Sequence, residues 1–536
     1  MPVFSVVTAA PPTPNGDLHL GHLAGPYSGA DVYTRACHLR GEGALYATGS
    51  DVHQSYVPAK ARTLGQEPLA MAQGFADEIA AIFDSIGFAV DSYVRPQHST
   101  GHQEAVRDFV LALDRQGRLE RRTEDCLYCE GCERYLFEAY VRGGCPHCGV
   151  VTDGSSCEVC AWPNVCTDLA DPRCTGCDGV PVLRSYQRLV FPLGRYTERL
   201  AEYHRRTVMS PRLRAFCLEL TEAGLPDIPL SHPTGWGLPV PVAGFEDQRV
   251  YVWAEMAPGY LNAVAEALGR RGDAADLRQV WDGAEIVQFF GFDNGYFHAA
   301  LIPALLMAYD EGLRLPDALL TNEFYELDAA KFSTSRRHAI WATDLLAHVP
   351  ADTVRFVLAL DRPEDERTDF TWQRFHALAD GELAGRWQPW LASVLDRLAA
   401  GAATGLTGLG DGHRAQLAEL ARLAARGHGA YLAGSFSPRT AARTLCDLVG
   451  STAEFAAAHP EDAATLAVEA AAAQLLAQLA HPVMPEFAER LWRALGHTGP
   501  VRWTGLRPLA AEGAAQAGTT FFLPQPADLE AKVMDR

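Results

Sequence analysis

The sequence predicts an α/β protein, in which a parallel sheet is split by a cysteine-rich insertion and followed by an α-helical bundle. Three observations lead to this fold class. Short apolar runs alternate with helical segments up to about residue 330, ten of the 13 cysteines fall between Cys126 and Cys177, and Ala/Leu-rich stretches with helical periodicity dominate from about residue 371. A chain of 536 residues is too long for one hydrophobic core, so we expect several domains.

The first half of the sheet is expected in residues 1–117. An apolar run at 3–10 (VFSVVTAA) is followed by a Pro/Gly turn, a helical segment and a second apolar run that ends in Gly49, Ser50 and Asp51. A doubly wound parallel sheet begins with this succession of strand, turn, helix and strand. The pattern resumes in residues 231–325 with EIVQFFGFDN and DALLTNEFYEL, so we expect the second half of the sheet there.

Residues 118–230 interrupt this pattern with four Cys-x-x-Cys pairs. Each pair brings two thiolates to one tight turn, and two pairs complete a tetrahedral four-sulfur zinc site. Eight cysteines suffice for two structural Zn²⁺ ions, and the alternative is one Zn²⁺ ion with a degenerate second site. A nest of disulfides does not suit a cytosolic chain. The spacing leaves the pairing order open. The candidate ligands are Cys129, Cys132, Cys145, Cys148, Cys157, Cys160, Cys174 and Cys177.

The remaining chain is expected to be largely helical. Residues 326–370 follow the sheet, 371–510 form the α-helical bundle and 511–536 a short tail. The net charge of −20 argues against an open phosphate-binding surface, although it is compatible with a local basic groove. We find no apolar run of 18 or more residues and no charged-then-apolar leader, and therefore expect a cytoplasmic enzyme without membrane contact.

Two short motifs point to nucleotide binding. His19 and His22 stand three residues apart where a helix begins, so both imidazoles can donate to phosphate oxygens beside free backbone N–H groups. Gly21 between them leaves room for a flat base. Lys331 follows much later in a Ser/Thr-rich loop, where a cation and hydroxyl groups can clamp a triphosphate. Either motif alone also suits a structural or surface role, but both occur in order on a split sheet.

At this point the sequence resembles the class I aminoacyl-tRNA synthetases, and specifically the methionyl-tRNA synthetase family. The resemblance spans essentially the whole chain: the HxGH signature, TGSDVH, the zinc knuckles, YVWAEMAPGY, GFDNGYFH, the KMSKS-like KFSTS and RPEDERTDFTWQRF. It implies a Rossmann-type catalytic sheet, a connective insertion, a KMSKS-like and stem-contact region at 326–370 and a degenerate anticodon-binding-like bundle. It also implies formation of an aminoacyl-adenylate from an amino acid and ATP with Mg²⁺.

The resemblance also implies roles for particular residues. His19, His22 and Lys331 would be catalytic, and Asp51 would pair with the substrate ammonium group. The implied ATP-binding residues are Asn15, Gly16, His19, Gly21, His22, Gly291, Asp293, Lys331, Ser333, Ser335 and Arg336. The implied amino-acid-binding residues are Ala10, Pro11, Thr13, Asp51, Trp253, Met256, Ala257, Tyr260, Asn294 and His298.

Several positions depart from the family pattern. Thr334 stands where the family has the second lysine of its KMSKS loop, and Phe292 stands where it has another lysine. Losing one electrostatic contact to a transition state typically slows a reaction about 10²–10³-fold, unless Arg336 or Arg337 compensates.

Three positions in the implied amino-acid pocket also differ from the family. Thr13 replaces a tyrosine lid, Met256 occupies space that a substrate side chain would need, and Asn294 adds a polar wall. These changes predict an amino acid smaller or more polar than methionine. The alternative is that the loops repack and methionine still fits.

The bundle departs from the family pattern as well. From 371 to 536 there are 14 Lys+Arg and 16 Asp+Glu, so no basic footprint for RNA is evident. We therefore expect a ligase in a specialised natural-product pathway, which passes the activated amino acid to a small amine, hydroxylamine or carrier with a separate partner enzyme. The alternatives are a methionine–tRNA ligase that charges tRNA and a non-catalytic binding protein.

Overall fold

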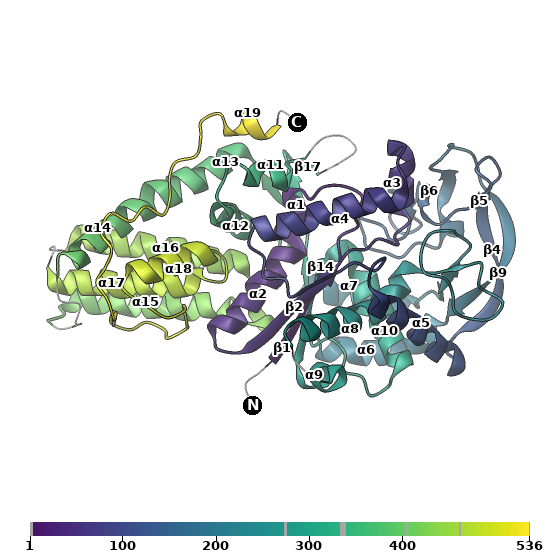
Figure 1. Ribbon diagram of the computed structural model, residues 1–536, viewed down its shortest axis with the longest axis horizontal. Helices are drawn as coiled ribbons and strands as arrows, with labels where there is room; N and C mark the ends of the chain where they lie inside the picture. The colour runs from purple at the N-terminus through teal and green to yellow at the C-terminus, as the bar shows by residue number, and fades with distance from the viewer. Residues whose placement is uncertain are drawn as a thin grey trace.

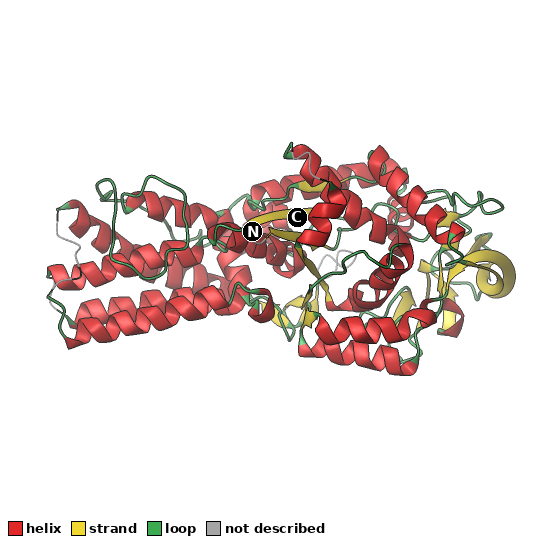
Figure 2. Ribbon diagram, turned by 90° about the horizontal axis from the view of Figure 1, so that it is seen from below, coloured by secondary structure: helices red, strands yellow, loops and turns green. Residues whose placement is uncertain are grey.

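The computed structural model describes residues 4–272, 276–332, 339–401, 406, 408–459 and 462–534. The molecule is elongated, with the parallel sheet in the middle, the cysteine-rich insertion at one end and the helical bundle at the other (Figure 1). The bundle helices run roughly along the long axis of the molecule (Figure 2).

Six parallel strands form the central sheet, in the order β10-β15-β14-β1-β2-β3. Successive residues of the inner strand β1 face opposite sides, so Val6 packs in one hydrophobic core and Val7 in another. The predicted parallel α/β sheet is therefore confirmed. The strands are β1 (Phe4–Ala9), β2 (Gly43–Gly49), β3 (Ser92–Val94), β10 (Val208–Met209), β14 (Glu285–Gly291) and β15 (Ala318–Asn322).

Helices cover both faces of this sheet. The core around Val6 contains residues of α5, α8 and α10, and the core around Val7 contains residues of α2, α4 and α12. Local signals begin some of them: at α4, the Glu67 side chain accepts from the Ala70 N–H and Pro68 is the first helical residue. The helices are α2 (Ser28–Leu39), α3 (Tyr56–Leu64), α4 (Pro68–Ser85), α5 (Thr100–Arg115), α6 (Thr197–Arg206), α7 (Pro211–Ala223), α8 (Val252–Arg270), α9 (Leu277–Gly283), α10 (Ile302–Tyr309), α11 (Ala342–Leu346) and α12 (Ala351–Leu360).

The insertion is built from antiparallel strands. Strands β4 and β9 pair from Glu120↔Val190 to Tyr128↔Val182, and a second sheet has the order β7-β6-β8. These long pairings carry the cysteine turns at their ends. The strands are β4 (Glu120–Cys129), β5 (Arg134–Tyr135), β6 (Glu138–Gly144), β7 (Val151–Gly154), β8 (Ala170–Cys174), β9 (Val182–Phe191), β11 (Ile228–Pro229), β12 (Ser231–His232) and β13 (Arg249–Val250), with 3-10 turns η2 (Cys166–Asp168) and η3 (Leu193–Tyr196).

The C-terminal part is the predicted helical region. Its helices α14 to α18 surround a core of leucine, alanine and aromatic side chains. They follow a small sheet of β16 (Tyr325–Leu327), β17 (Ala330–Lys331) and β18 (Thr368–Phe370). The helices are α13 (Trp372–His376), the π-helix η6 (Ala377–Trp387), α14 (Gln388–Ala399), α15 (Asp411–Gly429), α16 (Pro438–Ala458), α17 (Ala463–Ala480), α18 (Pro485–Ala494) and α19 (Leu529–Met534), with the 3-10 turn η7 (Ala433–Ser435).

Helix α17 corrects one sequence expectation. It is apolar over 18 residues, which is long enough to cross a membrane, although no such run was expected. Most of its length is buried inside the bundle, as is usual for the core helix of a globular domain.

A buried ion pair joins the bundle to the sheet domain. The Arg355 guanidinium of α12 donates to Asp31 of α2 at 2.5 Å and to the carbonyls of Pro482 and Val483, which lie between α17 and α18. Burial alone would raise the pKa of Asp31, but Arg355 and Arg35 lower it below its usual value.

We expect Arg355→Met to lower the free energy of unfolding by about 3–5 kcal/mol, because it leaves Asp31 buried with one partner fewer. Urea denaturation measures this loss. The matched control is Arg493→Met, which breaks an exposed pair with Glu489 and should cost no more than about 1 kcal/mol. Equal losses in the two variants would contradict the role given to Arg355.

Candidate active site

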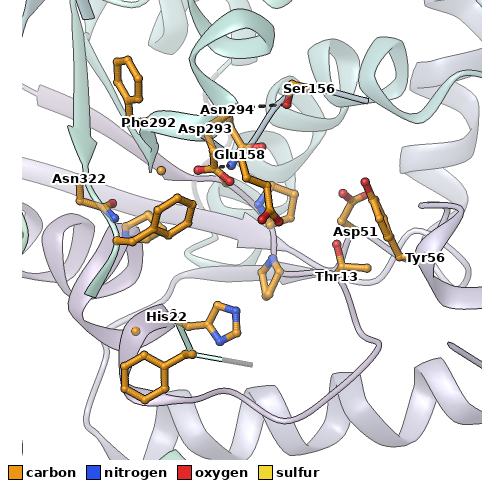
Figure 3. Close-up of a pocket in the computed structure, with 18 of the residues that line it drawn as sticks. Thr13, His22, Asp51, Tyr56, Ser156, Glu158, Phe292, Asp293, Asn294 and Asn322 are labelled. Carbon is orange, nitrogen blue, oxygen red and sulfur yellow. Dashed lines mark hydrogen bonds between the residues drawn. The ribbon is translucent and has the colours of Figure 1, made fainter. Parts of the chain in front are cut away.

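A cavity of about 400 Å³ opens at the carboxyl ends of the parallel strands. Its walls come from the segments that follow β1, β2, β14 and β15, which is where open α/β sheets bind ligands. Figure 3 shows Thr13, His22, Asp51 and Asp293 around it. The predicted site residues that line this cavity are Ala10, Pro11, Thr13, Asn15, Gly16, His19, Gly21, His22, Asp51, Trp253, Met256, Gly291, Asp293 and Asn294.

The two histidines lie against each other at the floor of the cavity. The rings of His19 and His22 stack with centroids 3.7 Å apart, and Phe332 stacks on His19 at 4.7 Å. The Nδ1 atom of His22 accepts from the backbone N–H of His19 at 3.2 Å, which fixes the tautomer of His22. A Cβ atom at Gly21 would lie 3.0 Å from the His19 ring, so glycine permits this close packing.

The histidines lie at the two ends of a short α-helix that continues directly as a π-helix. Helix α1 (Leu20–His22) passes into the π-helix η1 (Leu23–Tyr27), in which Gly25 leaves helical geometry next to Pro26. The N–H of Leu20 donates to the carbonyl of Ile340 at 3.1 Å. The segment after Lys331 therefore touches the histidine motif.

Lys331 ends strand β17, which pairs with β16 so that Lys331 stands opposite Glu326. The next residue, Phe332, lines the cavity, so the chain around Lys331 reaches it. Ser333, Ser335 and Arg336, which were predicted to bind ATP, lie outside the described residues, as do Thr334 and Arg337.

Asp51 follows β2 and is almost fully buried, with its backbone N–H donating to the carbonyl of Pro12. Burial raises the pKa of its carboxyl group well above the usual value, and the nearby Glu255 and Glu138 raise it further. A cation placed beside Asp51 would stabilise the charged form. The site therefore favours a ligand with an ammonium group.

Three predicted amino-acid-binding residues do not line the main cavity: Ala257, Tyr260 and His298. His298 is fully buried behind it and its Nδ1 donates to the carbonyl of Asn294, so its Nε2 accepts from the Tyr260 hydroxyl at 2.8 Å. Burial lowers the pKa of His298 to about 4, which keeps the ring neutral. Tyr260 instead lines a neighbouring cavity of about 40 Å³, and Met256 and Asp51 border both cavities.

The insertion supplies a wall that the sequence did not reveal. Asp153, Ser155, Ser156, Glu158 and Val159 line the cavity, and the Ser156 hydroxyl donates to the carbonyl of Asp293 at 3.2 Å. Two further lining residues that sequence reasoning missed are Arg212 and Glu323. No motif marks them, because they come from segments that are distant in sequence.

Two clusters of four cysteines lie in the insertion. Sulfur–sulfur distances are 3.4 Å for Cys129–Cys177, 3.7 Å for Cys132–Cys174, 3.8 Å for Cys145–Cys160 and 3.5 Å for Cys148–Cys157. A tetrahedral zinc site with Zn–S bonds near 2.3 Å has sulfur–sulfur edges of about 3.8 Å, so both clusters fit Zn²⁺. The pairing order that the spacing left open is resolved: Cys129, Cys132, Cys174 and Cys177 form one cluster, and Cys145, Cys148, Cys157 and Cys160 the other.

A parallel sheet, an insertion with cysteine clusters and a following helical bundle are the features that the resemblance to the class I aminoacyl-tRNA synthetases of the methionyl type predicts. The sequence profile of the family described as "tRNA synthetases class I (M)" matches residues 5–394, so the chain belongs to this family. Members of the family are ATP-dependent ligases, and the chain is one too.

Named relatives and solved structures agree with this placement. The chain is 36% identical over 392 residues to the methionine–tRNA ligase of Thermomicrobium roseum, covering 72% of this chain and 67% of that protein. It is 35% identical over 382 residues to the enzyme of the same name from Korarchaeum cryptofilum, covering 70% and 68%. A Mycobacterium tuberculosis methionyl-tRNA synthetase in complex with methionyl-adenylate shares the fold, with a TM-score of 0.79 at 21% identity over 97% of this chain and 99% of that one.

These relatives contradict the predicted specialised ligase with a small amine, hydroxylamine or carrier as acceptor, a separate partner enzyme and a natural-product pathway. The predicted alternative, a methionine–tRNA ligase, fits better. In the structure, the Asn294 amide has a hydrogen-bond partner within the protein, because it donates to Asp293 at 3.3 Å, and Met256 is one of the residues that line the cavity.

If Asp51 pairs with the ammonium group of the amino acid, as the resemblance implies, the KM for the amino acid should rise as the pH falls, because protonation removes the charge of Asp51. Burial raises the pKa of Asp51 in the free protein, so affinity is present above this pKa and is lost below it. Steady-state kinetics across neutral and acidic pH measure the effect. Asp51→Asn should raise the KM where the wild-type side chain is charged, leave it near the wild-type value where that side chain is protonated, and so abolish the shift. A wild-type KM that does not vary with pH would contradict this role.

Proposed function

We propose that this chain activates methionine with ATP as methionyl-adenylate and transfers the methionyl group to tRNA. One observation carries the proposal: a single cavity is lined by the histidine pair, the buried Asp51 and Phe332, the residue after Lys331. The relatives named methionine–tRNA ligase support methionine as the amino acid and tRNA as the acceptor. We infer further that the enzyme is cytoplasmic.

In the first step, a carboxylate oxygen of methionine attacks the α-phosphorus of ATP. The bond from this phosphorus to the bridging oxygen breaks, and pyrophosphate leaves with the electron pair. Asp51 would hold the methionine ammonium group, and His19 and His22 would donate to the phosphates and ribose. Lys331 would meet the leaving pyrophosphate. Mg²⁺ would enter with ATP and offset part of its charge.

In the second step, a terminal ribose hydroxyl of tRNA attacks the carbonyl carbon of the adenylate. The hydroxyl loses its proton, the bond from the carbonyl carbon to the phosphate oxygen breaks, and AMP leaves. The insertion that forms one wall of the cavity lies where it can border the incoming tRNA end. Burial of the adenylate in this cavity would protect it from water.

Both cysteine clusters would hold structural Zn²⁺, because four sulfur ligands leave no coordination position for a substrate. The two clusters differ in whether their turns border the cavity. The turn between Cys157 and Cys160 supplies Glu158 and Val159 to the cavity wall, whereas no residue from 129 to 132 lines it.

We therefore expect Cys157→Ser to lower both the zinc content, from two ions to one per chain, and the rate of amino-acid activation. The matched variant Cys132→Ser should lose the same amount of zinc and keep most of the activity. Metal analysis and ATP–pyrophosphate exchange on the same samples measure the two effects. The proposed difference fails if both variants lose activity equally.

Amino-acid-dependent ATP–pyrophosphate exchange with all twenty amino acids tests the proposed function directly. Methionine should give the strongest signal, and the methionyl group should then appear on tRNA. We expect His22→Ala to slow exchange about 10²–10³-fold, because a donor to the phosphates is lost. The exposed His98→Ala is the control and should leave exchange unchanged. Exchange with another amino acid alone would reject methionine, and full activity of His22→Ala would reject the ATP site.

A further inference from the structure

The cavity offers few positive charges to the triphosphate of ATP. ATP brings a highly negative triphosphate, and Phe292 and Thr334 stand where the family has lysines. Among the described residues that line the cavity, only Arg212 and Arg367 carry guanidinium groups. The lining carboxyl groups are Asp17, Asp51, Asp153, Glu158, Asp293 and Glu323.

Arg212 occupies the space beside Phe292. Its guanidinium carbon lies 4.1 Å from the centroid of the Phe292 ring, and Phe292 itself lines the cavity next to Asp293. A guanidinium over an aromatic face is attracted by the ring electrons, and this contact uses none of its N–H donors in a hydrogen bond. The positive charge of Arg212 therefore lies directly beside Phe292, which stands where the family has a lysine.

A second contact fixes the same side chain. The Nη1 atom of Arg212 lies 2.6 Å from Oε1 of Glu323, and the Glu323 side chain is only 6% exposed. The Arg212 side chain is 44% exposed, so the pair anchors one edge of the guanidinium and leaves other donors accessible. Arg367 pairs instead with Glu326 at 3.0 Å, and its guanidinium carbon lies 5.4 Å from the Phe324 ring.

Arg212 stands at the end of its helix that disfavours a cation, and the Glu323 carboxylate offsets part of this cost. It stands in the first turn of α7, directly after Pro211, and this turn has no acidic residue. The N-terminal end of a helix dipole disfavours cations and favours anions. An anion between this helix end and the guanidinium would be attracted by both.

We propose that Arg212 is a catalytic residue that contacts the triphosphate of ATP and stabilises the departing pyrophosphate. Its guanidinium supplies, from α7, the positive charge that Phe292 lacks. A guanidinium can bind two phosphate oxygens through two parallel N–H groups in one plane, a geometry that a lysine ammonium group does not offer. This inference rests on the proposed function, because it concerns the same ATP site.

The test compares the binding of ATP and adenosine by titration calorimetry. We expect Arg212→Ala to weaken ATP binding about 10- to 100-fold and to leave adenosine binding unchanged, because only the phosphates lose a charge-assisted contact. The KM for methionine should not change, while the rate of ATP–pyrophosphate exchange falls. Arg212→Lys should restore part of the ATP affinity. The control is Arg205→Ala, which breaks an exposed pair with Glu202 on α6 and should change neither ligand.

Each other outcome has a distinct meaning. If Arg212→Ala binds ATP as tightly as the wild type, the inference is wrong. If it loses ATP and adenosine equally and unfolds at a lower temperature, Arg212 has a structural role and the inference is also wrong. If the wild-type protein itself binds neither ATP nor adenosine, the proposed function is wrong, and the inference about Arg212 is wrong for the same reason.

Discussion

The histidine motif depends on one buried guanidinium. Pro26 has no N–H to donate, and Gly25 leaves helical geometry, so the helix after His22 exposes carbonyl oxygens in the protein interior. Arg362 donates to the carbonyls of Ala24 and Gly25 at 2.6 and 2.5 Å. Burial lowers the pKa of Arg362 to about 10, which still leaves it a cation at neutral pH. Gly29 provides the space, since a Cβ atom there would lie 2.7 Å from Arg362.

The segment that contains Arg362 and Glu364 also connects the helical bundle to the active site. The backbone carbonyl of Arg362 accepts from Arg439 of α16 at 3.0 Å, and the carboxylate of Glu364 accepts from the Ser437 hydroxyl and the Arg439 N–H. Arg362 and Glu364 thus link the beginning of α16 to the π-helix η1, which follows His22. A rotation of the bundle would disturb these contacts before it reached the cavity, so the contacts restrain the orientation of the bundle relative to the sheet.

The sequence predicted the parallel sheet, the bundle and most of the proposed site residues, because short motifs at strand ends report local geometry. His19, His22 and Asp51 follow strands or begin helices, and parallel strands bring such positions to one edge. The roles of Tyr260 and His298 were harder to predict, because a hydrogen bond to each other and complete burial place them behind the wall. Arg212 could not be predicted, since nothing in its own segment indicates that α7 packs beside Phe292. The pairing of the cysteines also required the strand pairing of the insertion.

The sequence interpretation treated Phe292 and Asn294 as isolated replacements, each of which removes or adds a charge or a polar group. In the folded protein, a guanidinium from α7 lies against Phe292, and the amide of Asn294 donates to Asp293. What a ligand meets is the sum of all groups around the cavity, including those from segments that carry no motif. The wrong prediction of the acceptor rested chiefly on the nearly balanced charge of residues 371–536, and a charge count over a whole domain does not say where the charges lie. A changed residue or composition therefore indicates a changed function only after its spatial neighbours are known.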